Sequence, residues 1–159
     1  MRILLISKEI YPDDPTGLGI STKSHCDILS KKGHILKVVS INEKKNSNFN
    51  IEIKNILHFI LKYFQLKNKA KKIIADYNPD IIIIESLQTL ISELFVFSAN
   101  KKRKIILISH GISIYPYKIS LKYIFRFLVY LFYLPVLFVL LSKVDYFFSL
   151  NWTNKSDRH

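Results

Sequence analysis

Short apolar runs recur along the chain and have the length and composition of β-strands. They consist mainly of isoleucine, leucine and valine without polar alternation, which is typical of strands buried on both faces of a parallel sheet. The most apolar of them, Ile81–Ile84, follows Asp80 and indicates a central strand. The runs that predict strands are 3–6, 35–41, 80–84, 105–108 and 146–150, with a shorter alternating run at 51–53.

Between these runs, apolar residues recur at intervals of three and four, the spacing of one face of a helix. The longest such pattern is Ile56–Tyr77, where lysines separate the apolar positions and Asn78-Pro79 marks the end. Shorter patterns predict helices over 20–32 and 87–99. Strands that alternate with helices predict one α/β domain on a doubly wound parallel sheet.

The loop between the first strand and the first helix, residues 11–19, is dense in proline, aspartate and glycine. Gly17 and Gly19 free its backbone, and the amides of the following helix point toward the loop, which suits a phosphate or another anion. Thr22 stands where the third glycine of a dinucleotide-binding loop would be, and no Lys-Ser or Lys-Thr pair follows a glycine. A flexible turn is therefore the alternative interpretation.

Polar residues follow three of the predicted strands, at the edge where their carboxyl ends meet. This edge holds the 11–19 loop, the Glu85-Ser86 corner and the Ser109-His110-Gly111 corner. Ligands of doubly wound sheets bind beyond the carboxyl ends of the strands, so we expect the binding site here. For His110 the alternative is a structural role, in which its ring hydrogen-bonds the backbone at the strand end.

Composition excludes several classes of protein. The chain has 159 residues, of which 49% are apolar, which fits a globular domain and not a disordered chain. Its single cysteine, Cys26, excludes an internal disulfide and fits a reducing compartment. The first apolar run is too short for a secretory signal. No histidine and cysteine cluster has metal-ligand spacing, and Asp13 and Asp14 lie between prolines as turn formers, so we predict no metal and no cofactor.

The chain is strongly basic, with 24 lysines and arginines against 12 acidic residues and a formal charge of +12. Such a charge indicates an anionic partner, a membrane surface or simply a solvated lysine-rich surface. The basic run 101–104 predicts a surface connection. Because no aromatic residues are interleaved with it, nucleic-acid binding is the weakest alternative.

A long apolar and aromatic segment occupies residues 119–142. Lys118, Lys122 and Arg126 recur every fourth residue and would form one basic stripe on a helix. Residues 127–142 contain no charge and would span about 24 Å as a helix, less than the roughly 30 Å of a bilayer core. Pro135 is expected to kink or break such a helix. The segment is therefore a buried helix, a spanning helix, or an interfacial helix with its basic stripe on anionic head groups.

Several short motifs, taken in order, resemble the N-terminal half of the retaining glycosyltransferases of family 4. The resemblance covers residues 1–159 as one domain and implies a Rossmann-like fold, one half of a GT-B architecture. The other half, which binds the donor, is absent from this sequence, so we expect the chain to be inactive alone, either as a fragment or as the partner of a separate donor-binding chain. The motifs are RILLIS at 2–7, GLG at 17–19, LSKKGH at 29–34, NPD at 78–80, HG at 110–111 and VDYFFS at 144–149.

The resemblance also implies roles for residues at the sheet edge. His110 would face the transferred sugar or its leaving phosphate as the catalytic residue, and Gly17, Gly19, Glu85 and Gly111 would line the substrate site. Relatives often carry histidines at the end of the strand that has Ile83 and Glu85 here, so Glu85 either contacts a sugar hydroxyl or is solvated.

The partners implied are a nucleotide-sugar donor, a polysaccharide or lipid-linked acceptor and an anionic membrane surface, without nucleic acid. The expected location is cytoplasmic, peripheral on the inner face of the plasma membrane. The alternative is a non-catalytic, basic Rossmann-like scaffold or membrane-binding module.

Overall fold

The centre of the molecule is a five-stranded sheet in which every strand is parallel to its neighbours. The computed structural model describes residues 1–13, 15–41, 56–87, 89, 91–100, 102–110, 131 and 133–149, with side chains from residue 61 in the segment 56–87. The strand order is β2-β1-β3-β4-β5, which confirms the predicted parallel α/β sheet. The strands are β1 (Arg2–Ser7), β2 (Ile35–Ser40), β3 (Ile81–Ile84), β4 (Lys104–Ser109) and β5 (Tyr146–Ser149).

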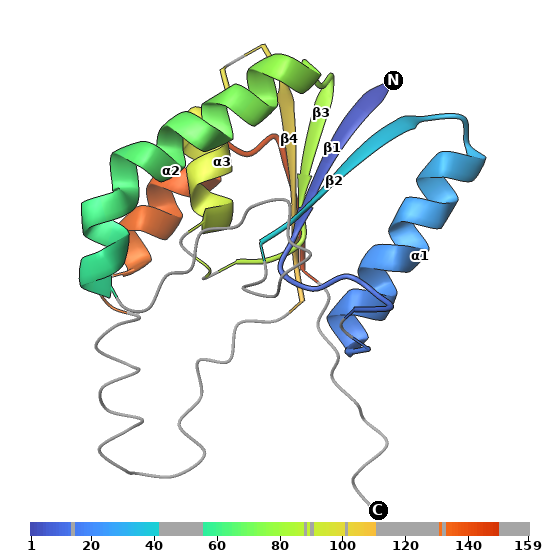
Figure 1. The fold of residues 1–159 in the computed structure, drawn as a ribbon, viewed down its shortest axis with the longest axis horizontal. Coiled ribbons are helices and arrows are strands. Elements are labelled where there is room, and N and C mark those ends of the chain that lie inside the picture. The colour runs from blue at the N-terminus through green and yellow to red at the C-terminus, as the bar shows by residue number, and fades with distance from the viewer. Residues whose placement is uncertain are drawn as a thin grey trace, which may run out of the picture.

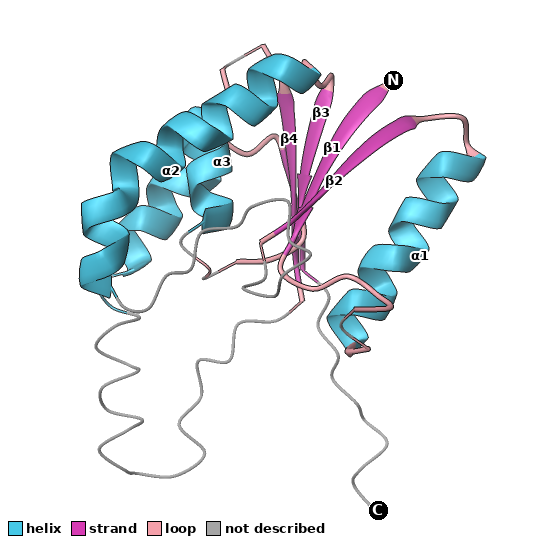
Figure 2. Ribbon diagram, in the orientation of Figure 1, coloured by secondary structure: helices cyan, strands magenta, loops and turns pink. Residues whose placement is uncertain are grey.

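Helices cover both faces of the sheet. Helix α1 (Gly17–Lys31) lies on one face, and α2 (Ile56–Tyr77) and α3 (Ile91–Ser98) lie on the other (Figure 1). Residues 133–141 are also helical and lie on the side of α2 and α3. Figure 2 shows the resulting three layers, helix, sheet and helix, by type of element. The alternation of strands and helices along the sequence therefore gave the layer structure correctly.

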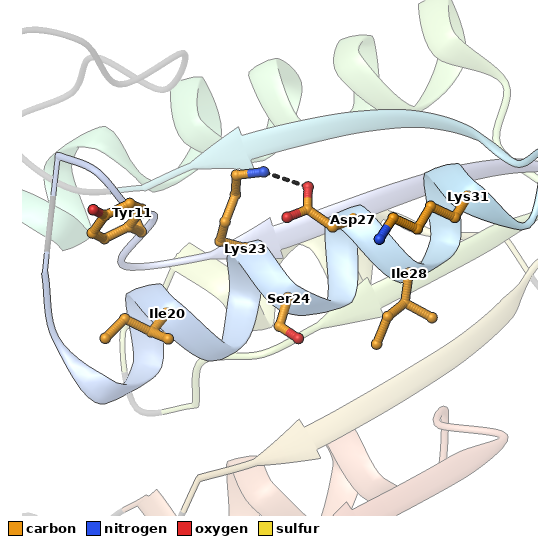
Figure 3. Close-up of a pocket in the computed structure, with 7 residues that line it drawn as sticks. All are labelled: Tyr11, Ile20, Lys23, Ser24, Asp27, Ile28 and Lys31. Atoms are coloured by element: carbon orange, nitrogen blue, oxygen red, sulfur yellow. Dashed lines mark hydrogen bonds and ion pairs between the residues drawn. The ribbon is translucent and has the colours of Figure 1, made fainter.

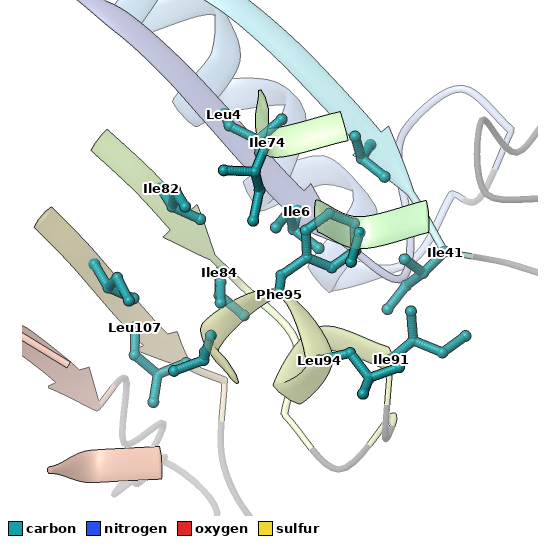
Figure 4. Packing of buried hydrophobic residues seen from close by; sticks show 14 of the residues in the cluster. Leu4, Ile6, Ile41, Ile74, Ile82, Ile84, Ile91, Leu94, Phe95 and Leu107 are labelled. Atoms are coloured by element: carbon teal, nitrogen blue, oxygen red, sulfur yellow. The ribbon is translucent and has the colours of Figure 1, made fainter. Parts of the chain in front are cut away.

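The core has two parts because successive side chains of a strand point to opposite faces. On the side of α2 and α3, Leu4, Ile6, Ile82 and Ile84 pack against residues of both helices (Figure 4). On the side of α1, Ile3, Leu5 and Ile83 are buried, and most of their neighbours are only partly buried. The side of α2 and α3 therefore holds the larger part of the core.

Two helices differ from the predicted bounds because side chains cap them. Helix α1 begins at Gly17, three residues before the prediction, because the Thr16 hydroxyl accepts a hydrogen bond from the Gly19 amide at 3.1 Å. Helix α3 begins at Ile91, where the Thr89 hydroxyl accepts from the amide of Ser92 at 2.9 Å. The prediction for Ile56–Tyr77 is confirmed. The predicted strand at 51–53 lies outside the described residues.

Polar side chains at the amino edge of the sheet hold the framework together. The carboxylate of Asp80 accepts a hydrogen bond from the Arg2 amide, and that of Asp145 accepts one from the Ile105 amide, both at 2.7 Å. The Arg103 guanidinium donates to the carbonyl of Ile74 at 2.9 Å, near the end of α2. Part of the basic run 101–104 therefore has a structural role.

The helical residues 131 and 133–141 belong to the long apolar segment. Pro135 lies among them and does not end the helix, so the expectation of a break at Pro135 is wrong. Leu140 is buried, and the Tyr133 hydroxyl donates to Glu93 at 2.5 Å. In the part of the chain that the structure describes, no helix is both long and apolar enough to span a bilayer. Lys118, Lys122 and Arg126 lie outside the described residues.

Candidate functional site

The carboxyl ends of β1, β3 and β4 place polar residues at one edge of the sheet. Ser7 ends β1, Glu85 follows β3, and Ser109 and His110 end and follow β4. The chain passes from β1 to β2 on one side and then returns to β3 on the other side of β1. The point between β1 and β3 is therefore where connections diverge, the usual place for a ligand in a doubly wound sheet.

Glu85 is the central group of this edge. Only 1% of the residue is exposed, so the interpretation of Glu85 as a solvated residue is wrong. Its Oε2 accepts a hydrogen bond from the Thr22 hydroxyl at 2.5 Å, and its Oε1 lies 2.6 Å from Nδ1 of His25. Because a carboxylate only accepts, His25 is the donor of the second bond. Both oxygens are thus bound by α1, and the side chain is fully enclosed, with none of its surface exposed.

Thr22 connects Glu85 to the end of β1. The hydroxyls of Thr22 and Ser7 lie 3.0 Å apart, and both residues are completely buried. Because Thr22 gives its proton to Glu85, the single proton of the Ser7 hydroxyl has two acceptors at 3.0 Å, the carbonyl of Glu9 and the Thr22 hydroxyl. The hydroxyl of Ser86 accepts from the Lys8 amide at 2.7 Å. This hydrogen-bond network fixes α1 against the ends of β1 and β3.

His25 and Thr22 are the residues of this site that the sequence did not identify. They lie three positions apart on α1 and so share one face of the helix. The side chain of His25 is 35% exposed, whereas that of Glu85 is inaccessible. The available signal was a polar pair, Thr22 and His25, on the face of α1 that also carries Cys26 and Leu29 toward the sheet.

His110 lies at the same edge and is partly buried. Its Nε2 is buried and has no hydrogen-bond partner among the described residues. Burial lowers the pKa of His110, the charge of His25 adds to this effect, and the Glu85 carboxylate opposes it. At neutral pH the ring is therefore neutral and carries an unused hydrogen-bonding nitrogen.

Gly17 and Gly19 belong to helix α1 and not to the preceding loop, where the sequence predicted them. Gly17 is exposed, and a Cβ on it would meet no other atom within 4 Å, so the fold does not require glycine there. Gly19 is buried in the first turn of α1, where its amide already donates to Thr16. The Thr16 hydroxyl in turn donates to the carboxylate of Glu9. The cap at the start of α1 is therefore already bound to a carboxylate of the protein itself, that of Glu9. Gly111 lies outside the described residues.

An open groove runs along the outer face of α1 (Figure 3). Lys23 and Asp27 form an ion pair on its wall. Neither Glu85, His25 nor His110 lines this groove, so it is separate from the buried polar network. The residues that line it are Tyr11, Ile20, Lys23, Ser24, Asp27, Ile28 and Lys31.

Metal and thiol chemistry have little support at this edge. Within the described ranges, no group of three histidine, cysteine or acidic side chains is arranged to hold a metal ion. Burial raises the pKa of Cys26, and the negative charges of Glu85 and Asp27 raise it further, against a smaller opposite effect of Lys23. The Cys26 thiol is therefore protonated at neutral pH and a poor nucleophile.

Comparisons with known proteins found no relative of this chain. No protein-family model matches the chain, and neither the curated proteins nor the solved structures contain a significant match.

Proposed function

We propose that this chain is the acceptor-side, Rossmann-like domain of a GT-B glycosyltransferase. In this proposal the complete enzyme moves a sugar from a nucleotide-sugar to a polysaccharide or lipid-linked acceptor. A second domain outside residues 1–159 binds most of the donor, so the chain alone does not transfer sugar. Two features support the proposal: the ordered motifs that resemble family 4 enzymes, and an all-parallel sheet with polar groups gathered at its carboxyl edge.

The observation that carries the proposal is the gathering of Glu85, His25 and His110 at the carboxyl edge of the sheet. Two imidazoles at the edge that holds an enclosed carboxylate provide hydrogen-bonding nitrogens, which suit the hydroxyl groups of a sugar. A buried carboxylate disfavours a second anion nearby, which argues against a diphosphate directly on this cluster. His110 is the proposed contact to the transferred sugar.

Sugar binding by the 159-residue chain tests this function. Saturation-transfer NMR with methyl hexosides, N-acetylhexosamines and short-chain prenyl-diphosphate sugars should give transfer to at least one compound. The His110→Gln variant should weaken that signal, while His34→Gln, at the turn before β2, should not. A folded chain that binds none of these compounds would contradict the proposal and favour the non-catalytic scaffold.

A membrane-facing role is proposed for the helical residues 131 and 133–141. Five apolar side chains there are exposed, among them Phe138 at 72% and Val139 at 51%, and the chain is strongly basic. Exposed apolar groups beside an excess of positive charge suit the interface of an anionic bilayer. The place of the protein would then be peripheral, on the cytoplasmic face of the plasma membrane.

Liposome flotation tests this partner. Binding should be stronger to anionic than to neutral vesicles, and both Phe138→Ser with Val139→Ser and the combined Lys118→Glu, Lys122→Glu and Arg126→Glu should weaken it. The matched control is Ile20→Ser with Ile28→Ser, since these residues are similarly exposed on α1, on the opposite face of the sheet (Figure 1). An equal loss of liposome binding in the control variant, or binding that does not depend on lipid charge, would contradict the proposal.

A further inference from the structure

The enclosed carboxylate of Glu85 has no direct access to a ligand. It is held by the Thr22 hydroxyl on one oxygen and by His25 on the other, and none of its side-chain surface is exposed. Burying a carboxylate is costly unless hydrogen bonds compensate for the lost water. Any effect of Glu85 on a ligand must therefore be transmitted by a residue that it binds. Of its two hydrogen-bond partners, His25 is the one with exposed surface.

The hydrogen bond to Glu85 determines the state of the His25 ring. A proton on Nδ1 is required to donate to Oε1, so in the neutral ring Nε2 carries the lone pair. The bond also restricts rotation of the ring, because rotation would move Nδ1 away from the carboxylate oxygen, which lies 2.6 Å from it. Nε2 lies on the far side of the ring from Nδ1, and the side chain is 35% exposed. Nε2 is thus the ring nitrogen that the bond to Glu85 leaves for a ligand, and in the neutral ring it is an acceptor.

His110 provides the second imidazole of the same edge. Its Nε2 is buried without a partner among the described residues, and the charges of Glu85 and His25 act on its pKa. Cys26 on α1 also senses the charge of Glu85, which together with burial raises the pKa of its thiol. Two histidines, one on α1 and one after β4, therefore lie at the edge that holds the enclosed carboxylate.

We propose that Glu85 is a positioning residue and that His25 is a ligand-contact residue, whose Nε2 accepts a hydrogen bond from a hydroxyl group of the sugar acceptor, beside the transferred sugar that His110 contacts. The nature of the ligand rests on the proposed function, whereas the positioning of His25 by Glu85 does not. The expected substrate contact is then His25 and not Glu85. The positioning role also explains why Thr22 and Glu85 are buried together: they orient the ring.

The positioning role is tested without ligand by ¹⁵N NMR of the histidine side chains in the full chain. In its neutral form the His25 ring should be a single tautomer, protonated at Nδ1. Glu85→Gln should convert it to a mixture or to the other tautomer, while the His34 signals, an internal control, stay unchanged. In the unaltered chain, a neutral His25 ring protonated at Nε2 alone would overturn the positioning role. This measurement does not depend on the folding of any variant.

The contact role is tested by titrating the chain with the sugar that gives the strongest saturation transfer. His25→Phe should weaken binding roughly three- to tenfold, the loss expected for one neutral hydrogen bond, and His25→Gln should restore part of it. Ser24→Ala, on the outer face of α1, is the matched control and should have no effect. Unchanged affinity of the His25→Phe variant would overturn the contact role. If no sugar binds the unaltered chain, the proposed function and the contact role both fail, while the tautomer still decides the positioning role.

Discussion

At the scale of single residues, the buried polar side chains are gathered near the carboxyl ends of the strands. Ser7, Thr22 and Glu85 form one connected network, in which the Thr22 hydroxyl contacts both of the other side chains. In a low-dielectric interior such a network is stable only while every member has a partner. This dependence makes the site sensitive to changes that leave its shape unaltered.

Thr22→Val is the sharpest test of this dependence. Valine has nearly the shape of threonine but cannot donate to Glu85, so a buried carboxylate oxygen loses its partner. We expect the free energy of unfolding to fall by about 1–3 kcal/mol, as measured by urea denaturation. Thr22→Ser keeps the hydroxyl and should lose less. Equal stability of the valine variant and the unaltered chain would show that the bond contributes nothing.

His110 should make the stability of the chain depend on pH. Burial lowers the pKa of His110 in the folded state below the ordinary value of 6.5. As the pH falls through 6.5, the unfolded chain therefore takes up a proton that the folded chain does not, and stability decreases. The decrease continues until the pH passes the lower pKa of the folded state.

The measurement compares urea-unfolding free energies at about pH 7.5 and about pH 5.5. In His110→Gln, which does not titrate, the difference between the two values should be smaller than in the unaltered chain. The same variant of His34 serves as the control. A larger pH dependence in His110→Gln would contradict the assigned direction of the shift.

At the scale of elements, α1 connects the framework to the site. Its inner face carries Thr22, His25 and Cys26 toward the sheet, and its outer face forms the open groove (Figure 3). Its start is fixed by Thr16, which accepts from the Gly19 amide and donates to Glu9. The position of His25 therefore depends on how the first turn is capped.

Removing the cap should loosen this end of the helix. We expect Thr16→Ala to lower the free energy of unfolding by about 1 kcal/mol, because the Gly19 amide loses its partner. Amide hydrogen exchange of residues 17–20 should increase while exchange in α3 stays unchanged. Thr16→Ser keeps the hydroxyl and should behave like the unaltered chain; fraying of the same size in that variant would exclude the cap as the cause.

At the scale of the whole molecule, the two faces of the sheet are unequally covered. The face toward α2 and α3 buries Ile84 completely (Figure 4). On the α1 face, Ile106 remains partly exposed. In β5, Tyr146, Phe147 and Phe148 are each about half exposed, at 51%, 48% and 54%. Stability is therefore concentrated on one side of the sheet.

Matched truncations on the two faces test this asymmetry. Ile84→Ala should cost about 2–5 kcal/mol of unfolding free energy, because a fully buried side chain leaves a cavity. Ile106→Ala should cost less, since part of its side chain is already in contact with water in the folded state. Urea denaturation of both variants measures the difference, and equal losses would show that the α1 face is packed as well as the other.

The sequence by itself determined the succession of elements in this protein. Apolar runs and helical spacing are local properties, so they located the strands and the helix Ile56–Tyr77 and indicated a parallel sheet. They also indicated the edge that carries Glu85 and His110, since residues after parallel strands must lie at the same edge. The start of α1 was misplaced because glycines near a loop are read as loop residues, whereas the Thr16 side chain extends the helix to include them.

Only the tertiary structure decided the strand order and the partners of Glu85. Thr22 and His25 are 63 and 60 residues away in sequence, and nothing local indicates that this face of α1 meets the end of β3. The burial of Glu85 follows from the same meeting, because α1 closes over the carboxylate and replaces its water with two hydrogen bonds. A pattern along the chain reports which residues are apolar or polar, but which polar groups become partners depends on how the layers pack.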